Sequence, residues 1–72
     1  MTKEEIFKEL TGLVIALKTP SLFADPQYMA QWKSKRIYIN QAINGLSKAD
    51  YGWLDTHYRA WHTREFPSLP KQ

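Results

Sequence analysis

The chain has 72 residues, a formal charge of +3 and no cysteine. A chain of this length forms one domain at most, and its folded core buries only about 60% of the unfolded surface. The absence of cysteine excludes disulfides, thiolate metal sites and thiol nucleophiles. Apolar residues make up 43% and charged residues 24%, which is typical of a folded globular chain. Ten residues are Phe, Trp or Tyr, and this aromatic content is the unusual feature of the composition.

The first helix is predicted over residues 3–18. Thr2 and Glu5 have the spacing of a capping box at its start. Pro20 predicts its end near Lys18, because proline disfavours helical backbone in the residue before it. The apolar residues between these signals share an arc about 120° wide; they are Ile6, Phe7, Leu10, Leu13, Val14 and Leu17.

A connector over residues 19–24 contains Leu22 and Phe23 and is too apolar for a free linker. We expect it to pack over a gap between helices. Asp25 followed by Pro26 then starts a second helix, predicted over residues 26–44. Gly45 is a natural residue just beyond its end. Its inward stripe comprises Met29, Trp32, Arg36, Ile39 and Ile43.

A third helix is predicted over residues 48–65. Ser47 supplies its N-cap. Its inward stripe consists of Tyr51, Leu54, Tyr58 and Trp61. Residues 67–72 contain two prolines and are predicted to be an extended tail.

These elements predict an all-α fold, a small antiparallel three-helix bundle over residues 1–66 with the tail at 67–72. The two short connections are those of adjacent antiparallel helices. In this bundle the aromatic stripes are expected to interdigitate with aliphatic residues of the first helix. The expected core contacts join Trp32, Tyr51, Tyr58 and Trp61 to Leu10, Leu13 and Leu17.

The sequence does not favour an enzyme. His57 and His62 lie five residues apart on one helix and point about 140° away from each other, so they do not form an i, i+4 metal pair. A glycine-rich phosphate loop and a Ser-His-Asp order are both missing from the sequence. Three short helices also leave little room for a ligand pocket. We therefore expect no catalytic residue, no metal, no cofactor and no small-molecule substrate.

Arg36 occupies an apolar position in the middle of its stripe. Three interpretations remain open for it. Its aliphatic stem covers the core while the guanidinium reaches water, or it forms an ion pair with Glu65, Asp50 or Glu9, or it is an anchor that contacts a partner.

Large apolar residues also lie outside the inward stripes, namely Trp53, Tyr38, Ile37 and Ile15. Such residues in a chain with little core to spare indicate a partner surface. We therefore expect a small protein–protein interaction module whose partner is another protein or a second copy of the chain. Small proteins of this kind often act as regulators or inhibitors of a larger assembly. The predicted partner-binding residues are Trp53, Tyr38, Ile37, Arg36, Lys33 and Lys35.

Weak nucleic-acid binding is the alternative. It would use the basic residues Lys33, Lys35, Arg36, Arg59 and Arg64. The charge of +3 is mild, and these side chains project in different directions along their helices. The chain start is acidic and the longest apolar run has five residues, 13–17, so no signal peptide or membrane span is expected. A cytoplasmic protein that does not contact membranes is the prediction.

Overall fold

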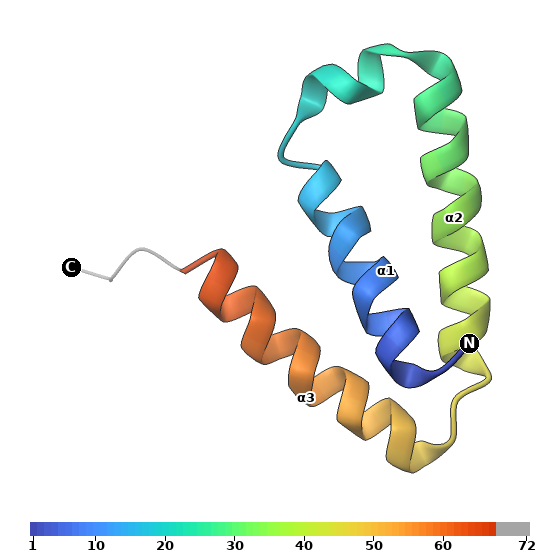
Figure 1. The fold of residues 1–72 in the computed structure, drawn as a ribbon, viewed down its shortest axis with the longest axis vertical. Helices are drawn as coiled ribbons and strands as arrows, with labels where there is room; N and C mark the ends of the chain where they lie inside the picture. The colour runs from blue at the N-terminus through green and yellow to red at the C-terminus, as the bar shows by residue number, and fades with distance from the viewer. Residues whose placement is uncertain (68–72) are drawn as a thin grey trace.

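A computed structural model describes residues 1–67 of the chain. It contains the helices α1 (Lys3–Ala16), α2 (Pro26–Asn44) and α3 (Lys48–Glu65), with a 3-10 helix, η1 (Pro20–Ala24), between the first two (Figure 1). Residues 1–67 include no strand. The all-α, three-helix fold class is therefore confirmed. Of the predicted tail at 67–72, all but Pro67 lies outside the described residues.

Each α-helix starts at the predicted capping residue. The backbone N–H of Glu5 donates to Thr2 Oγ1 over 3.2 Å, and the Glu5 carboxylate accepts from the Thr2 N–H over 2.9 Å. Asp25 Oδ1 accepts from the N–H of Gln27 over 3.0 Å at the start of α2. Ser47 Oγ accepts from the N–H of Asp50 over 3.2 Å at the start of α3. Side-chain oxygens thus satisfy donors that the first turns leave open.

The helix ends differ slightly from the prediction. α1 ends at Ala16 and not near Lys18, because the N–H groups of Leu17 and Lys18 bond to carbonyls only three residues back. This tightening is common at helix ends, and Pro20 follows directly. Gly45 caps α2 with a φ of −88°, so it does not take the left-handed conformation for which glycine is usually selected.

The helices form a single layer. α1 lies in the middle, α2 packs along one flank in the opposite direction, and α3 packs along the other flank and diverges from α1 toward its C-terminal end (Figure 1). The molecule measures 40 × 38 × 15 Å. Its shortest dimension is close to the diameter of one helix, about 10–12 Å with side chains. The predicted bundle is thus open and flat, with α1 as its common packing surface.

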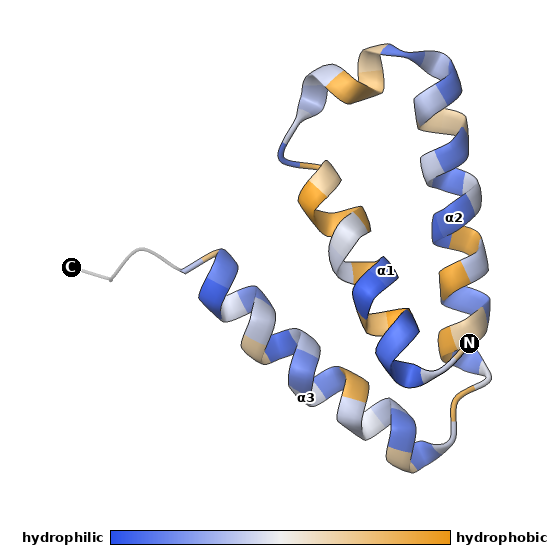
Figure 2. Ribbon diagram, viewed as in Figure 1, coloured by the Kyte–Doolittle hydropathy of each residue, from blue (hydrophilic) through white to orange (hydrophobic). Residues whose placement is uncertain are grey.

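The core follows from this arrangement. Ile6, Leu13, Ile39 and Leu54 form one buried cluster, and Trp61 is buried farther along α3. All five belong to the predicted stripes. Figure 2 shows hydrophobic residues concentrated along α1 and in the C-terminal half of α2, whereas α3 is mostly pale or blue. That contrast reflects a reliance of α3 on Trp and Tyr rather than on aliphatic residues.

Two residues expected in the core are exposed. Leu17 and Tyr51 each expose 53% of their surface. The prediction for them is wrong because α2 and α3 both pack on α1 and diverge, so their stripes do not close over one another. The connector over residues 19–24 packs against the helices in part, as expected. Phe23 packs edge-on against Tyr28 and Trp32 of α2, whereas Leu22 is exposed. Within residues 1–67, no helix is both long enough and apolar enough to cross a bilayer.

Candidate functional site

The positive charge of the chain is concentrated in α2. Within Pro26–Asn44 the helix carries Lys33, Lys35 and Arg36 and no acidic residue. The other two helices mix both signs. The three basic side chains of α2 nevertheless have different surroundings.

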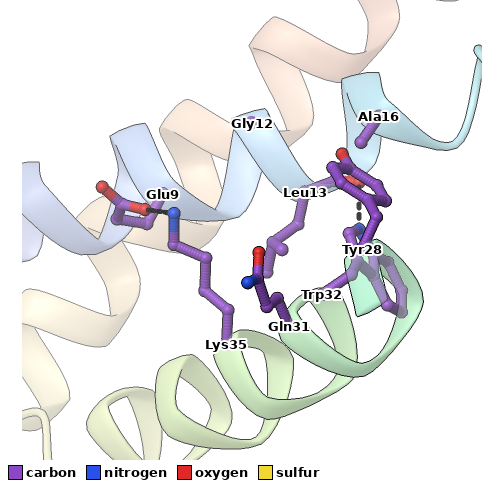
Figure 3. Close-up of a pocket in the computed structure, with 8 residues that line it drawn as sticks. All are labelled: Glu9, Gly12, Leu13, Ala16, Tyr28, Gln31, Trp32 and Lys35. Carbon is purple, nitrogen blue, oxygen red and sulfur yellow. Dashed lines mark hydrogen bonds and ion pairs between the residues drawn. The ribbon is translucent and has the colours of Figure 1, made fainter. Parts of the chain in front are cut away.

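Lys35 forms an ion pair with Glu9. Its Nζ lies 2.6 Å from Glu9 Oε2, which links α2 to α1. Figure 3 shows this pair at one end of a small cleft between the two helices, with Tyr28 and Trp32 at the other end. The cleft has a volume of about 260 Å³. Lys35 is therefore engaged within the chain, and its predicted contact with a partner would have to break this pair.

Arg36 is exposed at the edge of α2. Its guanidinium carbon lies 5.9 Å from the centre of the Trp32 ring, within range of a cation–π contact. Within residues 1–67 it has no ion pair, so the interpretation as a partner of Glu65, Asp50 or Glu9 is wrong for this structure. The acceptor Glu9 is taken by Lys35 instead. Arg36 as a partner anchor stays a prediction.

Trp53 is half-buried and packs against the core. Its ring meets Phe7 edge-on at 6.0 Å and stacks on His57 at 4.0 Å. Lys3 Nζ lies 5.5 Å from its centre. The expectation that Trp53 has no inward role is therefore wrong. α3 packs on the flank of α1 rather than between α1 and α2, which turns the side of α3 that carries Trp53 toward Phe7.

Ile37 and Tyr38 are exposed as predicted, by 59% and 58%. They precede the fully buried Ile39, so they lie on the side of α2 that does not contact α1. Lys33 is exposed one turn before Ile37. Lys33 and Ile37 project to the same side of α2, whereas Tyr38 projects about 100° around the helix from Ile37. We call these three exposed residues, Lys33, Ile37 and Tyr38, the outer α2 surface.

The basic residues of the nucleic-acid alternative are divided between two helices. Arg59 Nε pairs with Asp55 Oδ1 over 3.0 Å within α3, and Arg64 is exposed near the end of that helix. Because α2 and α3 flank α1 on opposite sides and diverge, these residues do not line up with Lys33 and Arg36 (Figure 1).

The two histidines stay apart. The Nδ1 atom of His57 lies 2.8 Å from the Trp53 carbonyl, whereas His62 lies among Tyr58, Trp61 and Phe66. In the part of the chain that the structure describes, no three His, Cys, Asp or Glu side chains gather as a metal site would require. The pKa of Glu5 is lowered, first by the Thr2 backbone N–H and then by the Thr2 hydroxyl, which is a capping effect.

An apolar groove that was not predicted from the sequence runs along α1. Two hollows of about 340 and 140 Å³ meet at Leu10. Val14 and Leu17 line the first hollow with Arg36 and Asn40 of α2. The second extends to Ile43 and to four residues of α3, which are Tyr51, Leu54, Asp55 and Tyr58. We call this feature the apolar groove.

A sequence signal for the groove exists. Phe7, Leu10, Val14 and Leu17 are spaced by three, four and three residues, as in the seam of a coiled coil. Phe7 packs on Trp53, whereas Leu17 is left exposed.

Comparison of the chain with protein-family models, with curated proteins and with solved structures gave no match.

Proposed function

We propose that the protein is a small non-enzymatic interaction module, which binds another protein through the outer α2 surface. The observation that carries the proposal is the exposure of two large apolar residues that are consecutive in the sequence, Ile37 and Tyr38, with the basic residue Lys33 one turn before Ile37. Large apolar and aromatic side chains that are desolvated by a partner contribute most of the energy of protein interfaces. The absence of acid from α2 favours a partner surface with acidic residues.

The attachment of α2 to α1 supports this role. The Trp32 indole N–H donates to the Leu13 carbonyl, Lys35 pairs with Glu9, and Ile39 is fully buried. These three contacts fix α2 on α1 over two turns. A side chain on a helix held in this way loses little additional freedom on binding, which favours affinity. Regulation or inhibition of a larger assembly is the kind of role that a module of this size would have.

The proposal is tested on a partner that is recovered from the source cell and then purified. Binding is measured by calorimetry for the native chain and for the double variant Ile37→Ser, Tyr38→Ser. We expect the double variant to weaken binding at least about 30-fold, as the loss of two hot-spot side chains would. The matched control is Ile15→Ser, because Ile15 is 50% exposed on α1. An equal loss in the control and the double variant would overturn the proposal.

Weak nucleic-acid binding remains the second candidate, and the observation that favours it is the concentration of positive charge in α2. Salt separates the two candidates. Phosphate contacts weaken steeply between about 50 and 200 mM salt, whereas an apolar interface changes little over that range. A recovered complex that is lost on nuclease treatment, and that weakens steeply with salt, would replace the first proposal with the second.

A further inference from the structure

We propose that the apolar groove is covered by a second copy of this chain, in a two-fold symmetric dimer whose axis runs parallel to α1. The inference goes beyond the proposed function, because it concerns a second surface and a different partner. It concerns the groove, which Ile37 and Tyr38 do not line. Four features support it. They are the single layer of helices, the apolar spacing along α1, the charges at the edges of the groove and the exposed area of the chain.

The layer is incomplete. Globular domains bury apolar faces between two packed layers of secondary structure, whereas this molecule is one helix thick. The apolar groove opens along α1, and Leu17 and Tyr51 are each 53% exposed at its ends. A second layer of the same shape would bury both residues.

The seam is self-complementary. Leu10, Val14 and Leu17 repeat with the four-then-three spacing by which two parallel helices interlock. A two-fold axis parallel to α1 places α1 of each copy alongside the other in the same direction. Because the axis runs along these residues, each of the three then meets its own counterpart in an isologous interface.

The charges match across the same axis. Rotation about an axis parallel to α1 places α2 of one copy over α3 of the other, at unchanged height along α1. On α2, Arg36 is at the groove edge one residue after Lys35, which pairs with Glu9. On α3, Asp55 is at the opposite edge, between Trp53 and His57, which both contact Phe7.

Arg36 and Asp55 are therefore at nearly the same height and on opposite edges of the groove. In the dimer, Arg36 of each copy faces Asp55 of the other, and two such pairs form. Asp55 is already a partner of Arg59 in its own helix, so the incoming guanidinium would share a carboxylate that is fixed in position. An axis perpendicular to α1 would instead bring α2 over α2 and place like charges together.

The exposed area of the chain is large for its mass. The chain exposes 5672 Å², whereas a compact monomer of this mass exposes about 4,700 Å² on the usual scaling. The surplus of about 1,000 Å² belongs to the whole chain and not to the groove alone, and it exceeds the roughly 800 Å² that each partner buries in a stable interface of standard size.

Sedimentation equilibrium of the full chain over a wide range of concentrations gives the first test. We expect a concentration-dependent species of twice the 8.5 kDa chain mass. A chain that stays at 8.5 kDa up to about 0.5 mM, where even weak dimers associate, overturns the dimer. That result leaves the proposed function intact, because the partner assay depends on Ile37 and Tyr38, which are outside the groove.

Two variants test whether the groove is the interface. Leu17→Lys places a charge in the groove, and Ile15→Lys makes the same change at a residue that is 50% exposed. Lysine near the C-terminal end of α1 is compatible with folding, and circular dichroism verifies this. We expect Leu17→Lys to raise the dimer dissociation constant at least about tenfold and Ile15→Lys to change it less than about twofold. Equal effects of the two variants would place the interface elsewhere and overturn the inference.

Charge reversal tests the direction of the axis. Arg36→Glu and Asp55→Arg should each weaken the dimer, and the double variant should recover most of the loss because the pair is re-formed with its signs exchanged. Lys48→Glu makes the same charge change at an exposed position in the first turn of α3 and serves as the control. A double variant no stronger than the weaker single variant overturns the parallel axis.

Discussion

The indole N–H of Trp32 in α2 donates a hydrogen bond of 3.1 Å to the backbone carbonyl of Leu13 in α1. This carbonyl lies in the last turn of α1, where the N–H of Leu17 bonds to Val14 rather than to Leu13. The side chain of one helix thus satisfies an acceptor that the end of another leaves open. Trp32 is therefore a C-terminal cap of α1 supplied from a distance in the sequence.

Trp32→Phe should lower the free energy of unfolding by about 1 kcal/mol, because it removes the hydrogen bond to Leu13 and keeps most of the ring. Urea denaturation measures the change. Trp53→Phe is the matched control, since no hydrogen bond from the Trp53 indole is present within residues 1–67. If the two variants lose the same stability, the bond to Leu13 contributes nothing beyond ring area.

Trp53→Ala should lower the free energy of unfolding by about 2 kcal/mol, because the ring is half-buried against Phe7 and His57. Tyr38→Ala should cost less than about 0.5 kcal/mol, because Tyr38 is 58% exposed. Thermal denaturation of both variants provides the comparison. Similar melting temperatures for the two would contradict the packing of Trp53 on α1.

The capping box of α1 should make stability depend on acidity. The pKa of Glu5 is lowered because the Thr2 backbone N–H, and then the Thr2 hydroxyl, stabilise its charged form. Stabilisation by a carboxylate with a lowered pKa is fully present above the ordinary value of about 4.3 and is lost as the pH falls through the lowered value. The melting temperature of the native chain should exceed that of Glu5→Gln near neutral pH, and the difference should shrink below about pH 4. A difference that persists unchanged in acid would show that Glu5 acts through its shape alone.

Glu9 and Lys35 should couple weakly. Their atoms lie 2.6 Å apart, but Lys35 is 54% exposed, so solvent screens the pair. A double-mutant cycle with Glu9→Gln and Lys35→Met should give a coupling of about 0.5 kcal/mol that decreases at high salt. Coupling above about 2 kcal/mol would mean that the cleft is far drier than its exposure indicates.

The apolar groove and the packing of Trp53 on α1 were not predicted from the sequence. Helical periodicity placed Leu13, Ile39, Leu54 and Trp61 in the core, because each lies on the apolar stripe of its helix and α1 packs against both other helices. It placed Leu17 and Tyr51 there as well, because the aromatic stripes were expected to interdigitate with aliphatic residues of the first helix. Two flanking helices that diverge leave those residues exposed and turn Trp53 inward instead.

The sequence by itself determined the helices. Thr2, Asp25 and Ser47 start them through hydrogen bonds that reach only two or three residues, and Pro20 acts within four residues of the end of α1. Tertiary structure alone decided how the helices meet, and hence which apolar residues are exposed. The spacing of a stripe fixes the side of a helix that is apolar, whereas the neighbour that covers it depends on contacts such as Trp32 to Leu13 and Phe7 to Trp53, which join distant parts of the chain.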